Sequence, residues 1–359
     1  MKQKPLLQFG AFVIASLAAT TSASAASWIG ATGNWTDDSW GLTGDYPGSG
    51  TQSGTSAQIE GSDDVVTVNT VIPNEVGFTR VNTGAVLNVA TGGSLTVKSG
   101  SVVDVQDATI NVTGGTLNLN HGVEFGRQLV SGETAYLNIS SGTLNFSGSS
   151  TSAFQFRNNS NLGTGAVAIS GTGSFVATTG RDFSHTDLAT VTTSLSDSAN
   201  FNMVGVTGSS HYDMAGDADV AGLSHTFSIT GSSVTAAVDT IDAFATAASQ
   251  QALFKFTANA FGFSTFDVGT LTLDGGDHAA DLIVDLNGLT SGSFDLFSYT
   301  TLNGSAFNSV TFLNGSATLD YGTGTLDAIS VSVIPEPSSC ALMAGSLCLG
   351  FVMLRRRQA

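Results

Sequence analysis

The chain has 359 residues, including 43 glycines, 5 prolines and 11 basic residues against 28 acidic ones, and its net charge is −17. Thr, Val and Phe fit pleated strands while Gly and Asn fit turns, so this composition favours strands over helices. Between the two ends, 27 acidic and 6 basic side chains leave a net charge of −21. That charge repels phosphate backbones and argues against nucleic-acid binding.

The first 25 residues have the pattern of a secretory signal peptide. Lys2 and Lys4 precede an apolar run over residues 9–19, and Ala-Ser-Ala at 23–25 is a small-x-small cleavage site. The alternative is an anchor helix, but threonines and serines break the run short of the roughly 20 residues that span a bilayer. We therefore expect export, with the general secretion machinery as a partner.

Residues 26–83 are predicted to form an N-terminal cap and the first strands. The three tryptophans of the chain, Trp28, Trp35 and Trp40, lie within 13 residues of one another. They fit either a ligand surface on which sugars stack or a cap over the open end of a strand stack, and we favour the cap. This opening resembles the start of many autotransporter-like passenger proteins, a resemblance that also implies a cap.

Residues 84–180 contain short strand units with alternating apolar and polar residues, separated by glycine turns. Their central apolar residues step by 8, 8, 7 and 7 positions, and these are Leu87, Leu95, Val103, Ile110 and Leu117. Such short units must stack to bury their apolar faces, which predicts a right-handed parallel β-helix with about 20 to 25 residues per rung. A β-sandwich of antiparallel hairpins is the alternative. The Gly-Gly-Ser/Thr-Leu-x-Val units also resemble autotransporter-like passenger repeats.

Residues 181–333 are predicted to form a β-rich C-terminal module. The repeat fades after residue 180, and 236–252 is the one stretch whose composition fits a helix. A phenylalanine-rich series of strand units starts at Leu253 and continues to Val333. The predicted fold class is therefore all-β, with a single transmembrane helix at the C-terminal end.

The last segment, residues 334–359, has three features in a fixed order. Pro335, Glu336 and Pro337 hold the chain extended, residues 339–354 are apolar or small, and arginines fill 355–357. Sixteen such residues are near the lower limit for a transmembrane helix, and the arginines keep its end in the cytoplasm. A buried core helix ending in a basic tail is the alternative.

This tail resembles the PEP-CTERM sorting signal, some examples of which are labelled as the C-terminal domain of ice-binding proteins. The resemblance implies recognition and cleavage by a membrane-embedded exosortase with its own Cys nucleophile. Pro335, Glu336 and Pro337 would be the sorting motif, and Arg355, Arg356 and Arg357 would set membrane orientation. The released body would then reach the cell surface or the extracellular polysaccharide matrix.

Residues suited to catalysis or metal binding are scattered. The only cysteines, Cys340 and Cys348, lie in the tail, and the histidines occur singly, so no zinc site is predicted. Neither a Gly-x-Ser-x-Gly elbow nor a phosphate-binding glycine loop with lysine occurs. We expect no cofactor, with a loose calcium site at Asp213, Asp217 and Asp219 as a weaker alternative.

These observations predict an exported, non-catalytic protein of the cell surface or extracellular matrix. Polysaccharide lyases also use parallel β-helices, but the few lysines and arginines of the repeats fall in different units, so we expect no enzyme. The alternative function is a glycan- or ice-binding adhesin module that uses flat Thr/Asn faces, with Trp28, Trp35 and Trp40 as further ligand contacts.

Overall fold

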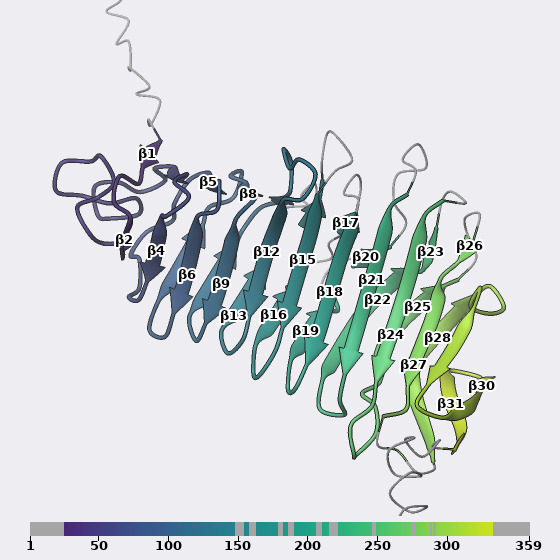
Figure 1. Cartoon of the computed structure of the whole chain (residues 1–359). Coiled ribbons are helices and arrows are strands. Elements are labelled where there is room, and N and C mark those ends of the chain that lie inside the picture. Colours follow the sequence, from purple (N-terminus) through teal and green to yellow (C-terminus); the bar gives the residue numbers. More distant parts are fainter. Residues whose placement is uncertain are drawn as a thin grey trace, which may run out of the picture.

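The structure, a computed structural model, describes residues 25–147, 154–157, 163–178, 182–185, 190–205, 210–214, 222–245, 249–273, 278–287, 289 and 292–332. Every regular element in these residues is a strand. The chain winds along an elongated body in which successive rungs lie side by side, from the N-terminal strands to the yellow C-terminal strands (Figure 1). Three faces run along this body.

The first face is a parallel sheet of eleven strands, one from each rung. It comprises β2 (Thr32–Asn34), β4 (Val65–Val68), β6 (Val86–Ala90), β9 (Thr109–Thr113), β12 (Thr134–Ile139), β15 (Thr164–Ile169), β18 (Thr190–Ser196), β21 (Ser224–Thr230), β24 (Gln251–Thr257), β27 (Asp281–Asp285) and β29 (Val310–Leu313).

The second face belongs to the larger, 18-stranded sheet. It comprises β7 (Ser94–Val97), β10 (Thr116–Leu119), β13 (Thr143–Phe146), β16 (Ser174–Ala177) and β19 (Asn200–Met203). Beyond β19 it continues into the first half of β22 (Thr235–Asp242) and then β25 (Phe266–Thr272) and β28 (Ser293–Asn303).

The third face completes the same sheet, because β22 pairs with β19 through its first half and with β20 through its second. The third face comprises β1 (Ala26–Ser27), β3 (Ala57–Ile59), β5 (Thr79–Asn82), β8 (Val103–Gln106), β11 (Val123–Phe125), β14 (Phe154–Phe156), β17 (Asp182–His185), β20 (His211–Asp213) and the second halves of β22, β25 and β28.

The rungs repeat at the interval that the sequence predicts. Asn88 lies beside Asn111 in the next rung, 23 residues on, and Thr96 lies 22 residues before its neighbour Asn118. From β6 to β20 each rung contributes three short strands, so units one step apart in sequence lie on different faces. Units three steps apart pair in parallel, which confirms the parallel β-helix-like repeat and differs from the antiparallel pairing of the β-sandwich alternative.

Alternation within each strand creates one continuous core. Leu87, Leu95, Val103, Ile110 and Leu117, the apolar positions of the sequence repeat, are all at most 2% exposed. Because side chains alternate across a strand, the Thr, Asn and Ser residues between them point outward. Because this pattern repeats from rung to rung, apolar residues stack on apolar residues inside the body, and polar residues lie beside polar residues on its outside.

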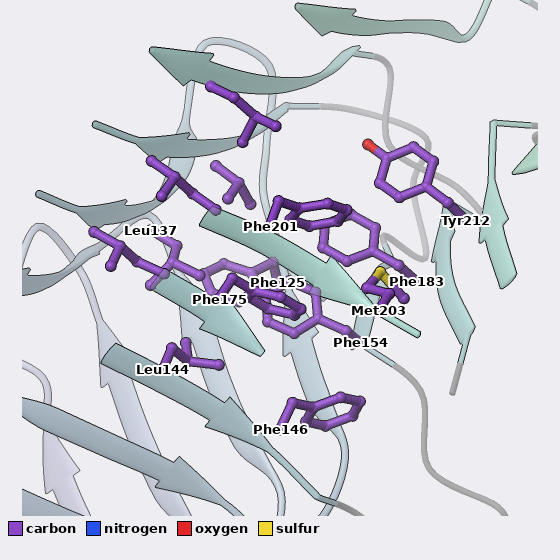
Figure 2. Close-up of a cluster of buried hydrophobic side chains, with 14 of the residues drawn as sticks. Phe125, Leu137, Leu144, Phe146, Phe154, Phe175, Phe183, Phe201, Met203 and Tyr212 are labelled. Atoms are coloured by element: carbon purple, nitrogen blue, oxygen red, sulfur yellow. The ribbon is translucent and has the colours of Figure 1, made fainter. Parts of the chain in front are cut away.

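The core changes from aliphatic to aromatic along the body. Phe154, Phe183 and Tyr212 occupy equivalent positions in three successive rungs, and their rings stack with centroids 4.7 and 4.8 Å apart. Figure 2 shows these rings with Phe175 and Phe201, which stack at 5.2 Å in a neighbouring column. Stacked rings fill the wider rungs that smaller side chains would leave hollow.

The two ends of the body are closed differently. At the N-terminal end the buried Trp35 and Trp40 pack 4.6 Å apart, and the indole nitrogen of Trp35 donates to the carbonyl oxygen of Pro47. At the other end β30 (Ser316–Tyr321) and β31 (Thr325–Ser332) form an antiparallel hairpin, and β31 also pairs antiparallel with β28. The tryptophans at one end and the hairpin at the other therefore cover apolar core residues that, in the middle of the body, the next rung would bury.

One predicted element is wrong. The stretch 236–252, expected to suit a helix, instead contains β22, the short strand β23 (Phe244–Ala245) and the start of β24; β23 pairs antiparallel with β26 (His278–Ala279). Ala236, Val238 and Ile241 point into the core between polar residues, so stacking on neighbouring rungs overrides the helix preference of alanine.

No helix in the part of the chain that the structure describes is long and apolar enough to cross a membrane. The predicted transmembrane helix 339–354 and nearly all of the predicted signal peptide lie outside the described residues. Beyond residue 181 the described strands continue the same sheets as the repeats.

Candidate functional site

The predicted tryptophan cluster lies in the core of the N-terminal end. Trp35 and Trp40 are fully buried and Trp28 is 6% exposed. Trp28 packs edge-on against Trp40, with centroids 5.2 Å apart, and Trp40 donates from its indole nitrogen to the carbonyl oxygen of Trp35. Trp40 packs against both other rings and all three belong to the buried core, so their faces are closed to a sugar in this arrangement.

The first face presents no charged side chain on the described strands from β4 to β21. The outward residues of these strands are partly exposed and are Thr, Ser, Asn, Ala and Val, with a single Tyr at position 136. Strands lie about 4.8 Å apart and outward residues recur about every 6.6 Å along a strand. The result is a flat grid of hydroxyl, amide and methyl groups.

The second face continues this grid. Its outward residues in strands β7 to β19 are Ser, Thr, Asn and Val, again without charge. Short turns join the two faces, for example at Gly92 and Gly114, which have φ of 83° and 95°. We call the outward side of strands β4–β21 of the first face and β7–β19 of the second face the neutral surface.

Amide side chains form ladders within the neutral surface. Asn111 donates to Asn88 at 2.9 Å and accepts from Asn138 at 3.0 Å. On the second face Asn118 donates to Thr96 at 3.1 Å and accepts from Asn145 at 2.9 Å. These bonds tie three rungs together on each face and hold the amides in fixed orientations.

The third face carries charged side chains on the same rungs whose other two faces are neutral. Within the described residues all five ion pairs lie on or beside this face, including Arg80 with Asp104 at 3.2 Å and with Glu60 at 3.5 Å. The side chain of Asp104 is 1% exposed, and its Oδ2 also accepts a hydrogen bond from Gln106 at 2.7 Å. A buried carboxylate needs such partners, so this arrangement is consistent with a structural role.

A shallow depression on the third face collects acidic residues further along. It is lined by Asp182, Ser184, His211, Asp213 and Asp242, and the His211 imidazole lies 3.7 Å from the carboxylate of Asp242. Asp213, one member of the predicted calcium loop, is therefore on this face, while Asp217 and Asp219 lie outside the described residues. Among the described residues no three His, Cys, Asp or Glu side chains are grouped to hold a metal ion.

A second polar depression lies at the edge of the first face beyond β21. Its lining includes Gln251, His278, Asp281 and Asn308. Burial raises the pKa of Asp281, but hydrogen bonds from Ser309, Asn308 and Gln251 lower it and leave the pKa below its ordinary value. These bonds, at 2.7 to 3.3 Å, keep the carboxylate ionised and fixed.

One polar cluster is enclosed in the aromatic core. The hydroxyl of Tyr212 donates to Thr193 Oγ1 at 2.8 Å and lies 3.0 Å from His225 Nε2, and all three residues are buried. Burial raises the pKa of Tyr212 well above its ordinary value, although the bond with Thr193 lowers it somewhat. The cluster is closed to solvent and links the first and third faces across the core.

The fold and these surfaces define a class of protein: a parallel β-solenoid with a neutral surface over parts of two faces and a charged third face. The chain matches no family model, and comparisons with curated proteins and with solved structures also find no match. The assignment of function therefore depends on the chain itself.

The structure does not describe the predicted sorting motif, Pro335, Glu336 and Pro337, or the arginines at 355–357. The sequence predicts polar strand faces, and the separation of neutral strands from charged ones becomes visible in the structure. This separation could have been predicted from the sequence, because charged residues such as Arg80, Asp104 and Glu124 recur in the third unit of successive rungs.

Proposed function

We propose that this chain is an exported, non-catalytic structural protein of the cell surface or extracellular matrix. A PEP-CTERM-like tail would tether it temporarily to the inner membrane until an exosortase processes it. The observation that carries the structural part is the unbroken stack of rungs, in which core side chains and amide ladders repeat in register. Such a stack suits a load-bearing or spacing element because each rung supports its neighbours.

Delivery is tested by changing Pro335, Glu336 and Pro337 together to alanine in the full chain. We expect the variant to remain in the cytoplasmic membrane while the unchanged protein reaches the envelope surface or medium, as measured by fractionation and mass spectrometry of both termini. Pro73→Ala, an exposed proline of the body, is the matched control and is expected to be released normally. Equal release of the triple variant would refute the sorting proposal.

The non-catalytic role is tested separately with the purified mature protein. We expect no release of reducing ends or unsaturated sugars from neutral or acidic polysaccharides. Turnover at enzyme-like rates would overturn this part of the proposal and would direct attention to the acidic depression of the third face.

A second candidate function is binding of a glycan or of ice through the flat faces. The neutral surface supports it, because its regular grid of small hydroxyl and amide groups is uncharged on a body that is otherwise strongly acidic. Glycan-array binding and thermal-hysteresis measurements test the two ligands, and negative results in both would remove this candidate.

A further inference from the structure

The neutral surface has one outward aromatic side chain, on the central strands of the first face. Tyr136 of β12 is 43% exposed, whereas the tryptophans are buried. Its neighbours in the adjacent strands are Thr109 and Ala166. Both are smaller than tyrosine, so the ring is the largest outward group on the first face between β4 and β21.

Small and polar groups surround this ring in a regular pattern. Thr134 and Asn138 precede and follow Tyr136 on the same side of β12, and Thr164 and Ala168 flank Ala166 on β15. Asn138 is held by its bond to Asn111. A flat aromatic ring beside methyl groups, with hydroxyl and amide groups around it, suits the face of a sugar ring, which offers C–H groups at its centre and hydroxyls at its edge.

The negative charge of the chain favours neutral sugars over acidic ones. An acidic polysaccharide would approach a chain of net charge −17 against repulsion, and the outward groups of this face include no cation to offset it from β4 to β21. A neutral polymer meets no such barrier. Small side chains such as Thr and Ala also lose little rotamer entropy when they are covered.

We propose that Tyr136 and the outward residues of the first-face strands β9, β12, β15 and β18 form a binding track for a neutral polysaccharide chain. The sugar ring would stack on Tyr136 beside Ala166, and the chain would run across the strands, where successive rungs offer hydroxyl groups about every 4.8 Å. This inference rests on the second candidate function and specifies its ligand class and its location.

The test uses the purified mature protein and a soluble, neutral β-1,4-glucan, hydroxyethyl cellulose, in affinity electrophoresis, with a cello-oligosaccharide for calorimetry. We expect retardation by the neutral polymer and none by alginate, an acidic polymer. Tyr136→Ala is expected to weaken binding at least tenfold. Phe261→Ala, which removes an 87% exposed aromatic ring from the turn after β24, is the matched control and should bind like the unchanged protein.

A second pair of variants locates the track without altering the tyrosine. Ala166→Glu places a bulky charge beside Tyr136 and should abolish binding, whereas Thr116→Glu places the same charge on the second face and should leave binding within twofold. Circular dichroism and thermal midpoints establish that each variant is folded.

The outcomes separate the two proposals. Binding to glucan that survives Tyr136→Ala and Ala166→Glu would overturn the track but preserve glycan binding elsewhere on the chain. No binding to any neutral glycan would overturn both, and the structural role, tested by fractionation, would stand. Loss of a dimer in Tyr136→Ala by light scattering, without glucan binding, would instead assign this face to self-association and refute the track.

Discussion

The first rungs and the later rungs of this solenoid fill their cores with different side chains. In the narrow half, residues 26–119, the core beyond the tryptophan cap consists of Val, Leu, Ile and Ala. In the wide half, residues 123–303, phenylalanine stacks dominate. The first-face strands lengthen from four residues in β4 to seven in β18, so a larger interior must be filled. Side-chain volume therefore follows rung size.

The turns from the first face into the second also change along the body, between β16 and β19 of the wide half. Where the first face turns into the second, Gly93 and Gly173 precede equivalent strands, and a Cβ at either would overlap a carbonyl oxygen of the previous rung. One rung later the equivalent position holds the buried Ala199. The tight corner excludes every side chain, whereas the later corner has room for a methyl group.

The largest expected effect tests the aromatic core. Phe154→Ala should lower the free energy of unfolding by about 3–5 kcal/mol, because it removes a ring that stacks on Phe125 and Phe183. Leu117→Ala in the narrow half should cost about 2–5 kcal/mol and fall at the lower end, since its smaller rung can collapse more easily. Urea unfolding followed by circular dichroism measures both, and a greater loss for Leu117→Ala would break the comparison.

The next effect concerns the corners. Gly93→Ala should destabilise the protein by about 1–3 kcal/mol, because the new methyl group must displace the backbone at Val68. The reverse change in the wide half, Ala199→Gly, should cost only about 0.5–1 kcal/mol through added flexibility of the unfolded chain. Thermal midpoints of the two variants, compared with the unchanged protein, decide whether the corners differ as described.

A third prediction addresses the polar cluster of the wide half. Tyr212→Phe keeps the ring stack but removes the hydroxyl that bonds Thr193 and contacts His225, so we expect a loss of about 1–3 kcal/mol at neutral pH.

The same variant predicts the pH dependence. The folded-state pKa of Tyr212 is raised, so the unfolded state releases its proton first and the stability that this group contributes falls as the pH rises above about 10. The phenylalanine variant lacks this contribution. Unfolding midpoints between pH 8 and 11 should therefore decline less steeply for Tyr212→Phe, and parallel declines would contradict the assignment.

The smallest effect tests the amide ladder of the narrow half. Asn111→Ala removes two side-chain hydrogen bonds and should cost about 0.5–1.5 kcal/mol. Thr192→Ala, at another outward site of the first face in the wide half, is the control and should cost less than about 0.5 kcal/mol. Equal losses of stability in the two variants would show that the hydrogen bonds of the ladder add no stability beyond that of a solvated polar side chain.

Much of the fold could be predicted from the alternation of residues along each unit. Leu87, Ile110 and Leu117 are buried as expected. The pairing partner of a unit was harder to predict, because units next to each other in sequence look alike, while in the middle rungs only units three steps apart pair in a sheet. Position 236 shows the limit of propensity, since its alanine is favourable in a helix yet lies in a strand fixed by neighbouring rungs.

The candidate site could be predicted less well. Tyr136 appears in the sequence as one more member of a strand unit, and only the three-faced arrangement reveals that its outward surroundings lack charge. The tryptophans show the opposite case, in which a conspicuous cluster is buried. Local sequence indicates whether a side chain points inward or outward, but the chemistry of a whole face depends on residues that are one rung apart.

The antiparallel hairpin at the end of the body has a consequence for the proposed export. A rung pairs only with its neighbours, so a chain that emerges from a translocation channel with its N-terminus first can add rungs in order, each templated by the one before. Strand β31 reverses direction against β28 and can close the stack only after the whole body has crossed. Under the proposed export, assembly would start at the tryptophans and stop at β31, whose antiparallel pairing ends the parallel stacking of the larger sheet.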